Sequence, residues 1–173
     1  MLFDPQKVKK QSINFQEINK ILEKAYKNIL EAEKGSDPDS KFSLAYESML
    51  KTALALLRSY GYRPRSGAGH HAVLVQLSKK ILGPKFDNLT STYNQMRKKR
   101  NKILYDINSA TKLEAGSSVH IARRFFQAVE QKISKDNPQQ KFWKPWFYEN
   151  FIRKKYESRF NFYHKRKKSK IIR

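Results

Sequence analysis

Apolar residues recur every three or four positions along most of the first 130 residues, which is the period of an amphipathic helix. The first stripe follows Asn14, which with Glu17 resembles a capping box, and it ends near Gly35. A second helix is expected over about residues 41–60, because residues 37–40 (Asp-Pro-Asp-Ser) supply caps and a first-turn proline. Its apolar residues extend beyond one face, so we expect it to be the most buried helix.

Glycine and proline separate the helices that follow. Residues 62–69 are expected to form a loop, because they contain Pro64, Gly67 and Gly69. A third helix is expected from roughly His70 to Leu82, where Gly83-Pro84 closes it. The fourth is expected from Asp87 to about Asp106.

A fifth helix carries apolar residues from Val119 to Ile133 at spacings of three and four, behind the capping candidates Gly116-Ser117-Ser118. We find no run in which apolar and polar residues alternate between turn pairs, so no strand is expected. The sequence therefore predicts an all-α protein, an antiparallel up-down bundle of four to five helices with a basic aromatic helix at the C-terminus.

Composition narrows the function classes. The chain has no cysteine, which excludes a disulfide scaffold and a thiolate metal site, and its four histidines are too scattered to indicate zinc. No cofactor or metal is expected. The first residues do not resemble a signal peptide and no long apolar window occurs, so we expect a cytoplasmic protein without a membrane span. A net charge of +22 indicates a polyanionic partner.

Half of that net charge lies in residues 131–173, which hold 14 Lys and Arg against three Asp and Glu, with 10 of the 22 aromatic residues. We therefore expect two domains, a helical bundle over 1–134 and a basic aromatic extension over 135–173. From Tyr148 to Tyr163 aromatic and aliphatic residues recur at helical spacing among cations. The candidate phosphate-binding residues of this extension are Arg153, Lys154, Lys155, Arg159, Lys165 and Arg166.

Three interpretations of the extension remain open. Its aromatic face can pack on the bundle while its charges stay solvated. It can bind RNA or DNA, because aromatic residues interleaved with Lys and Arg are the chemistry of single-strand platforms. It can also dock on a membrane surface or on an acidic protein. The first two interpretations are compatible with each other.

On the fourth helix, Arg100 interrupts the apolar stripe. An arginine on a core-facing side needs a carboxylate such as Glu47, a ligand anion or an interface, because burying it alone costs several kcal/mol. Arg97, Asn101 and Tyr105 lie four apart on an adjacent face. These guanidinium, amide and phenol groups suit a phosphate together with a base or ribose edge.

Five segments are informative through their order and spacing. They are Tyr46-Glu47-Ser48-Met49-Leu50, Ala53-Leu54-Ala55-Leu56-Leu57, Gly61-Tyr62-Arg63-Pro64, Gly69-His70-His71 and Arg100-Asn101-Lys102-Ile103-Leu104-Tyr105. Together they resemble the HEPN superfamily of small helical bundles. The resemblance covers about residues 40–106 well, extends more weakly to Ile133 and does not include the extension. It implies an up-down bundle, commonly dimeric, whose active members are metal-independent endoribonucleases of toxin–antitoxin and phage-defence systems.

The signature of active members is an arginine, often followed by a polar residue, with a histidine about five positions later. Arg100 and Asn101 match it, but Tyr105 stands where the histidine is expected. A phenol with a pKa of about 10 is a poor base at pH 7, so binding survives this substitution better than catalysis does.

Two arrangements can supply the proton-transfer group that the missing histidine would otherwise provide. His70 and His71, at the start of the third helix, can approach the end of the fourth helix of their own chain or of a dimer partner. Alternatively, they are a capping pair packed against Tyr62. In the second arrangement, Arg100 and Tyr105 from two chains meet across a dimer groove, because residues five apart on one helix point about 140° apart.

The sequence thus predicts an RNA-binding, dimeric HEPN-like protein of a prokaryotic defence or toxin–antitoxin system. Whether it is an enzyme stays open. If active, it is a metal-independent endoribonuclease in which Arg100 stabilises phosphorane charge and Tyr105, His70 or His71 transfers protons. The alternative is a non-catalytic adaptor or structural partner, for example of a nucleotidyltransferase-type protein or another antitoxin, that docks through its basic extension.

Overall fold

The computed structural model describes residues 3–65, 67, 69–105 and 109–138 of the 173-residue chain. The chain divides into two units, residues 1–138 and 139–173, and the described residues belong to the first. Several residues singled out from the sequence lie outside the described ranges. They are Asp106, Tyr148, Arg153, Lys154, Lys155, Arg159, Tyr163, Lys165 and Arg166. The basic aromatic helix expected at the C-terminus therefore also lies outside the described residues.

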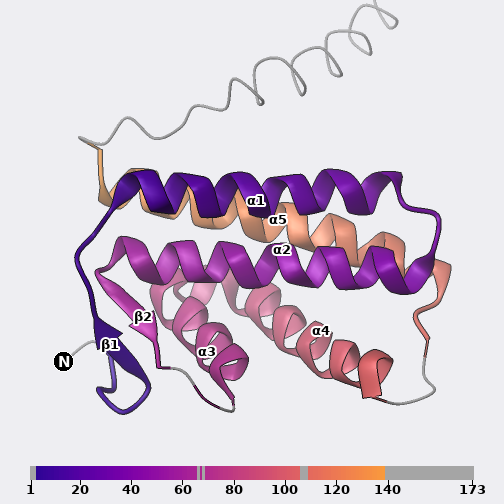
Figure 1. Cartoon of the computed structure of the whole chain (residues 1–173), viewed down its shortest axis with the longest axis horizontal. Coiled ribbons are helices and arrows are strands. Elements are labelled where there is room, and N and C mark those ends of the chain that lie inside the picture. The colour runs from indigo at the N-terminus through magenta and orange to yellow at the C-terminus, as the bar shows by residue number, and fades with distance from the viewer. Residues whose placement is uncertain (1–2, 66, 68, 106–108, 139–173) are drawn as a thin grey trace, which may run out of the picture. The chain divides into compact units, whose positions relative to one another are not determined.

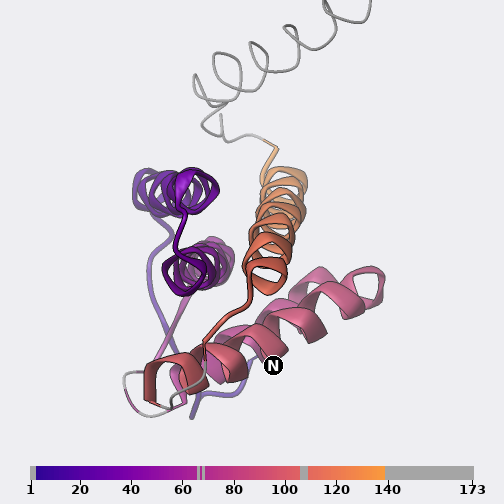
Figure 2. The same cartoon turned by 90° about the vertical axis from the view of Figure 1, so that its right-hand side faces the viewer.

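The described residues form a helical bundle, which confirms the all-α prediction. Helices α1 and α2 lie side by side and antiparallel, α5 packs against both, and α3 and α4 lie obliquely on the side of α2 away from α1 (Figures 1 and 2). The elements are β1 (Val8–Lys10), α1 (Phe15–Lys34), α2 (Pro38–Ser59), β2 (Tyr62–Pro64), α3 (His70–Leu82), the 3-10 turn η1 (Pro84–Phe86), α4 (Asp87–Tyr105) and α5 (Lys112–Asp136).

Helix α2 is the centre of the bundle. It begins at Pro38, three residues before the expected position, because the carboxylate of Asp37 caps it by accepting a hydrogen bond from the backbone N–H of Ser40 at 2.8 Å. Buried residues lie on more than one of its faces, as expected. They are Phe42, Ala45, Tyr46, Ser48, Met49, Thr52, Ala53, Ala55, Leu56, Leu57 and Ser59.

The predicted start of the fifth helix is wrong. Helix α5 begins at Lys112, and Gly116-Ser117-Ser118 lie inside it. The true cap is Thr111, whose hydroxyl accepts from the backbone N–H of Glu114 while the Glu114 carboxylate accepts from the backbone N–H of Thr111. This reciprocal capping box satisfies two backbone donors at once, which a glycine-serine pair cannot do in the same way.

The expectation of a loop over residues 62–69, with no strand, is also wrong in part. Residues Tyr62–Pro64 form β2, which pairs antiparallel with β1 and places Val8 opposite Pro64. Gly61 makes the turn from α2 into β2 with a φ of +76°, and a Cβ there would lie 3.3 Å from the carbonyl oxygen of Gln11. Each strand is only three residues long, and the two are more than 50 residues apart in the sequence. Neither strand is therefore long enough to show an alternation of apolar and polar residues that would predict the pairing.

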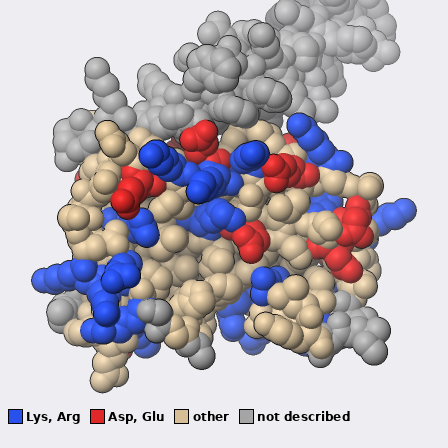
Figure 3. Space-filling model, in the orientation of Figure 1, with Lys and Arg blue, Asp and Glu red and all other residues tan. Residues whose placement is uncertain are grey.

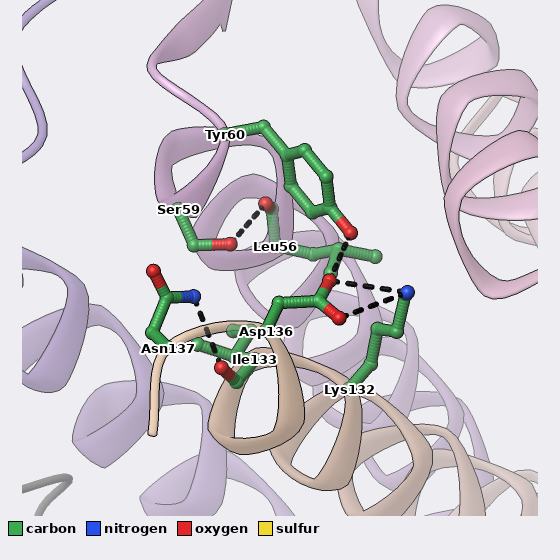
Figure 4. Close-up of polar contacts among 7 residues, drawn as sticks. All are labelled: Leu56, Ser59, Tyr60, Lys132, Ile133, Asp136 and Asn137. Atoms are coloured by element: carbon green, nitrogen blue, oxygen red, sulfur yellow. Dashed lines mark hydrogen bonds and ion pairs between the residues drawn. The ribbon is translucent and has the colours of Figure 1, made fainter. Parts of the chain in front are cut away.

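A polar clasp joins the C-terminal ends of α2 and α5 (Figure 4). The hydroxyl of Tyr60, which caps α2, donates to the carboxylate of Asp136, and the ammonium of Lys132 lies 3.1 Å from the same carboxylate. Burial and the bond to Asp136 raise the pKa of Tyr60, so the phenol stays protonated and keeps donating at neutral pH.

Replacing Tyr60 with Phe removes this clasp without changing the packing of the ring. We expect the free energy of unfolding to fall by about 1 kcal/mol, because a hydrogen bond to a carboxylate is lost at a half-buried position. Urea denaturation measures the change. The matched control is Tyr105→Phe, which removes a hydroxyl from a ring that is 82% exposed, and it should leave stability unchanged. Equal stabilities of the two variants would show that the clasp contributes nothing.

Candidate functional site

Helix α4 is buried only along its first half. Its buried residues end at Met96, and Arg97, Arg100 and Ile103 that follow are half-buried. The Nε atom of Arg100 is buried and has no hydrogen-bond partner, and no carboxylate among the described residues lies within 4.0 Å of its guanidinium. Glu47, the expected partner, instead pairs with Lys51 at 2.8 Å. The structure therefore leaves Arg100 without the ion pair that its position requires.

The guanidinium of Arg100 lies against the ring of Tyr46, with its Cζ atom 5.9 Å from the ring centroid. Such a cation–π contact stabilises by about 0.5–2 kcal/mol. Desolvating a guanidinium costs more than that when no anion is near. The contact thus holds Arg100 in place but does not satisfy its N–H donors, and the terminal N–H groups of this half-buried side chain stay available to an anion.

The same tyrosine connects Arg100 to a histidine of α3. The hydroxyl of Tyr46 and the Nδ1 atom of His71 are 3.0 Å apart, and their ring centroids are separated by 5.9 Å. His70 packs edge-on against His71, with ring centroids 4.3 Å apart, and its own Nδ1 lies 3.0 Å from the Gly67 carbonyl oxygen. Thus His71 packs on Tyr46 of α2, while His70 holds the loop before α3.

We call Tyr46, His71, Arg97 and Arg100 the Tyr46 cluster. Three helices supply it, α2, α3 and α4, and Tyr46 is almost fully buried while the other three side chains are half-buried. A buried ring is therefore flanked by a histidine and an arginine that both reach solvent. The Tyr46 ring also lies 6.0 Å from that of Tyr93 on α4, so the cluster rests on the bundle core.

The surroundings of the cluster set its protonation at neutral pH. Burial raises the pKa of Tyr46 to about 12, although the charges of Arg100 and Arg97 oppose the increase. Burial lowers the pKa of His71 below its ordinary 6.5, and the nearby charges of His70, Arg100 and Arg97 lower it further, against Glu47. At pH 7 Tyr46 is therefore a protonated phenol and His71 a neutral imidazole, which is a proton acceptor.

The residues expected to form a groove on α4 do not all come together. Arg97 and Arg100 belong to the Tyr46 cluster, and the Nε of Arg97 donates to the Asn94 side-chain oxygen at 3.1 Å. Asn101 and Tyr105 lie on the exposed part of the helix, where 82% of the Tyr105 surface is accessible. Within the described chain, no contact joins Tyr105 to Arg100, as their 140° separation on a helix requires.

Sequence reasoning missed Tyr46 as a site residue, because it fits the apolar stripe of α2. The available signal was its hydroxyl, since a tyrosine on the most buried helix needs a hydrogen-bond partner and His71 is a suitable one. Asn94, which orients Arg97, was missed because it lies one turn before the conspicuous basic run.

Among the described residues, no three His, Asp or Glu side chains gather as metal ligands would. None of the helices that the structure describes has an apolar stretch long enough for a bilayer.

The family model of the HEPN domain matches residues 16–132, from the start of α1 to near the end of α5. The chain belongs to the HEPN family. Membership is consistent with a nuclease or RNA-binding role in toxin or defence systems, and HEPN domains commonly bind RNA and dimerise. No curated protein matches the chain in sequence. The matched region of this HEPN domain contains the whole Tyr46 cluster.

The protonation of His71 provides a direct test of the cluster. An NMR titration of its imidazole should give a midpoint below 6.5, because burial and neighbouring cations disfavour the charged ring. Since the folded pKa lies below the unfolded one, this histidine costs no stability above pH 6.5 and destabilises the protein as the pH falls further. A midpoint at or above 6.5 would contradict the geometry.

The Arg100→Gln variant should raise that midpoint, because it removes a nearby positive charge. Arg124→Gln is the matched control: it makes the same charge change at an exposed position of α5 and should leave the midpoint unchanged. Equal titration midpoints in the two variants would show that the charge of Arg100 does not act on His71.

Proposed function

We propose that this chain is an RNA-binding HEPN protein of a prokaryotic defence or toxin–antitoxin system, in which the Tyr46 cluster holds a phosphate of the RNA backbone. The observation that supports this best is Arg100, a half-buried guanidinium with a buried, unpartnered Nε and no carboxylate nearby in the described chain. A phosphate supplies the missing charge and accepts from the free N–H donors. Arg97 adds a second cation beside it.

The position of His71 favours metal-independent cleavage as the activity of this site. RNA cleavage without a metal requires a base for the 2′-hydroxyl proton, and a neutral imidazole suits this role near pH 7. Tyr46 cannot serve, because its pKa is about 12. Its hydroxyl oxygen instead accepts a hydrogen bond from the Nδ1–H of His71, which fixes the ring and leaves Nε2 as the free proton acceptor.

The reaction then proceeds by internal transfer. His71 accepts the proton of the 2′-hydroxyl, the 2′-oxygen attacks the adjacent phosphorus, and the bond from phosphorus to the 5′-oxygen breaks. The leaving 5′-oxygen takes a proton from water, and the hydroxide that remains takes the proton that His71 received. The products are a 2′,3′-cyclic phosphate and a 5′-hydroxyl, and His71 is neutral again. Arg100 stabilises the charge that accumulates on the phosphoryl oxygens in the transition state.

We further propose that the protein is a homodimer, with Tyr105 at the groove that the two copies share. Leu104, Tyr105 and Leu113 are large residues that expose 49%, 82% and 80% of their surface at the end of α4 and the start of α5. A second copy can cover them and bring its Tyr105 near the first copy's Arg100, where the phenol can hydrogen-bond phosphate or stack on a base.

Labelled RNA incubated with the purified full chain in EDTA tests these roles. We expect cleavage that survives EDTA and leaves a 2′,3′-cyclic phosphate. His71→Ala should slow cleavage about 10²- to 10⁴-fold, the usual loss for a general base, while RNA binding changes little. Arg100→Ala should reduce both cleavage and affinity, because it removes a phosphate contact as well as transition-state stabilisation. Arg124→Ala, on an exposed part of α5, is the control for charge.

Each other outcome selects a different function. Binding that is lost in Arg100→Ala without any cleavage supports a non-catalytic RNA-binding module. Absence of RNA binding supports an adaptor or structural partner of a nucleotidyltransferase-type protein, docking through the basic extension. Cleavage that returns when inactive Arg100→Ala and His71→Ala chains are mixed would show that the two residues act across a dimer.

A further inference from the structure

The paired strands β1 and β2 place cations opposite one another. Lys9 pairs with Arg63 across the antiparallel ladder, and both side chains are exposed. The ladder extends by one further pair, since the backbone N–H of Arg65 donates to the Lys7 carbonyl at 3.0 Å. Residues two apart on a strand face the same side. Lys7, Lys9, Arg63 and Arg65 therefore share one face, which we call the basic ribbon.

Carboxylates do not neutralise the basic ribbon. No ion pair within 4.0 Å involves these four residues in the part of the chain that the structure describes. Two of them make contacts with neutral groups: Lys7 Nζ donates to the side-chain oxygen of Gln76 at 3.4 Å, and Arg65 Nε donates to the Pro5 carbonyl at 2.8 Å. Lys9 and Arg63 make no such bond in this part of the chain. Figure 3 shows Lys and Arg gathered without an acidic neighbour where Figure 1 places β1 and β2, whereas the surface over α1 mixes both signs.

Local packing holds these charges together against their repulsion. Like charges directly opposite on two strands destabilise a ladder. The inner side of the strands compensates, since Val8 is buried and the buried ring of Phe3 packs against Tyr62 and Tyr60 at centroid distances of 4.7 and 6.4 Å. The cations are thus fixed on a rigid support rather than spread on flexible arms.

We propose that the basic ribbon is a second RNA-contact surface, which binds the phosphate backbone of a single strand apart from the Tyr46 cluster. Cations two residues apart on a strand are separated by roughly 7 Å. This is of the order of the separation between successive phosphates, and two of the four groups are arginines, whose forked donors match phosphate oxygens. The face carries no exposed aromatic ring on which a base could stack. It therefore recognises the charge and spacing of the phosphates and not the identity of the bases.

This proposal rests on the proposed function, because it assigns a further part of the same RNA ligand. It also explains why the repulsion of Lys9 and Arg63 is tolerated: RNA phosphates neutralise the face when they bind. The protein without RNA then keeps an unneutralised ribbon, whose repulsion salt screens.

The test uses the full chain and a fluorescein-labelled poly(U) 20-mer, with affinity measured by anisotropy over a range of salt concentrations. In the Lys9→Gln/Arg63→Gln variant, the slope of log K against log [salt] should become shallower by about 1.4, which is about 0.7 for each of two phosphate contacts on a single strand. The affinity at 0.1 M salt should fall about tenfold or more. The matched control, Lys20→Gln/Lys24→Gln, removes the same charge from exposed positions on α1 and should change affinity less than twofold.

A charge-conserving swap, Lys9→Arg/Arg63→Lys, should keep the slope of the unaltered chain. The melting temperature at low salt should be the same or higher in the Gln variant, because repulsion is removed, so lost binding cannot be attributed to unfolding. If the Gln variant and the control bind poly(U) equally well, the ribbon proposal fails and the proposed function stands. If the unaltered chain binds no poly(U), both fail. Tighter binding of poly-glutamate than of poly(U) at the ribbon would assign the face to an acidic protein instead.

Discussion

The burial of α2 on several sides is the constraint on which the rest of the structure depends. A helix enclosed by α1, α5 and the α3–α4 pair cannot carry an unsatisfied polar group without a cost of about 1–3 kcal/mol. Tyr46 lies in this helix, and its ring is almost fully buried. The need to satisfy its hydroxyl links the packing of the core to the placement of His71 on α3.

The same ring also determines where Arg100 lies. Because α4 loses its buried face after Met96, the guanidinium that follows lies against the edge of the core, over Tyr46 and near solvent. A core residue thus places a proton acceptor and a cation on two sides of one ring. In the proposed function, this arrangement supplies charge stabilisation and proton transfer without a metal, which is the chemistry that a metal-independent ribonuclease requires.

Most of the fold could be predicted from local signals. The start of α1 after Asn14 and its end at Gly35 follow from the residue types at these positions. The limits of α3 likewise follow from the glycines that flank it, Gly69 and Gly83. The start of α5 was misplaced, because Gly116 and the following serines look like a cap when Thr111 and Glu114 are overlooked. The β1–β2 pairing could not be predicted, since each strand is three residues long and the partner is distant in sequence.

The candidate site was only partly predictable. Arg100 was identified because it interrupts an apolar stripe, which is a local pattern. The role of His71 depends on how α3 packs against α2, and periodicity along a single helix carries no information about that. Tyr105 was chosen by its spacing from Arg100, but the structure exposes it on another side of α4, so a role for it requires a second chain. The basic ribbon was missed together with its strands.

The central claim is that Arg100 is left without a carboxylate so that its guanidinium can bind an RNA phosphate. The most direct measurement follows the Nε–H signal of Arg100 by NMR while a 2′-O-methyl RNA oligonucleotide, which cannot be cleaved, is added to the full chain. We expect this signal to shift with saturation, because a phosphate bound at the terminal N–H groups of the guanidinium changes the electric field at the buried Nε–H. An Arg100 signal that stays unchanged while other arginines shift would contradict the account.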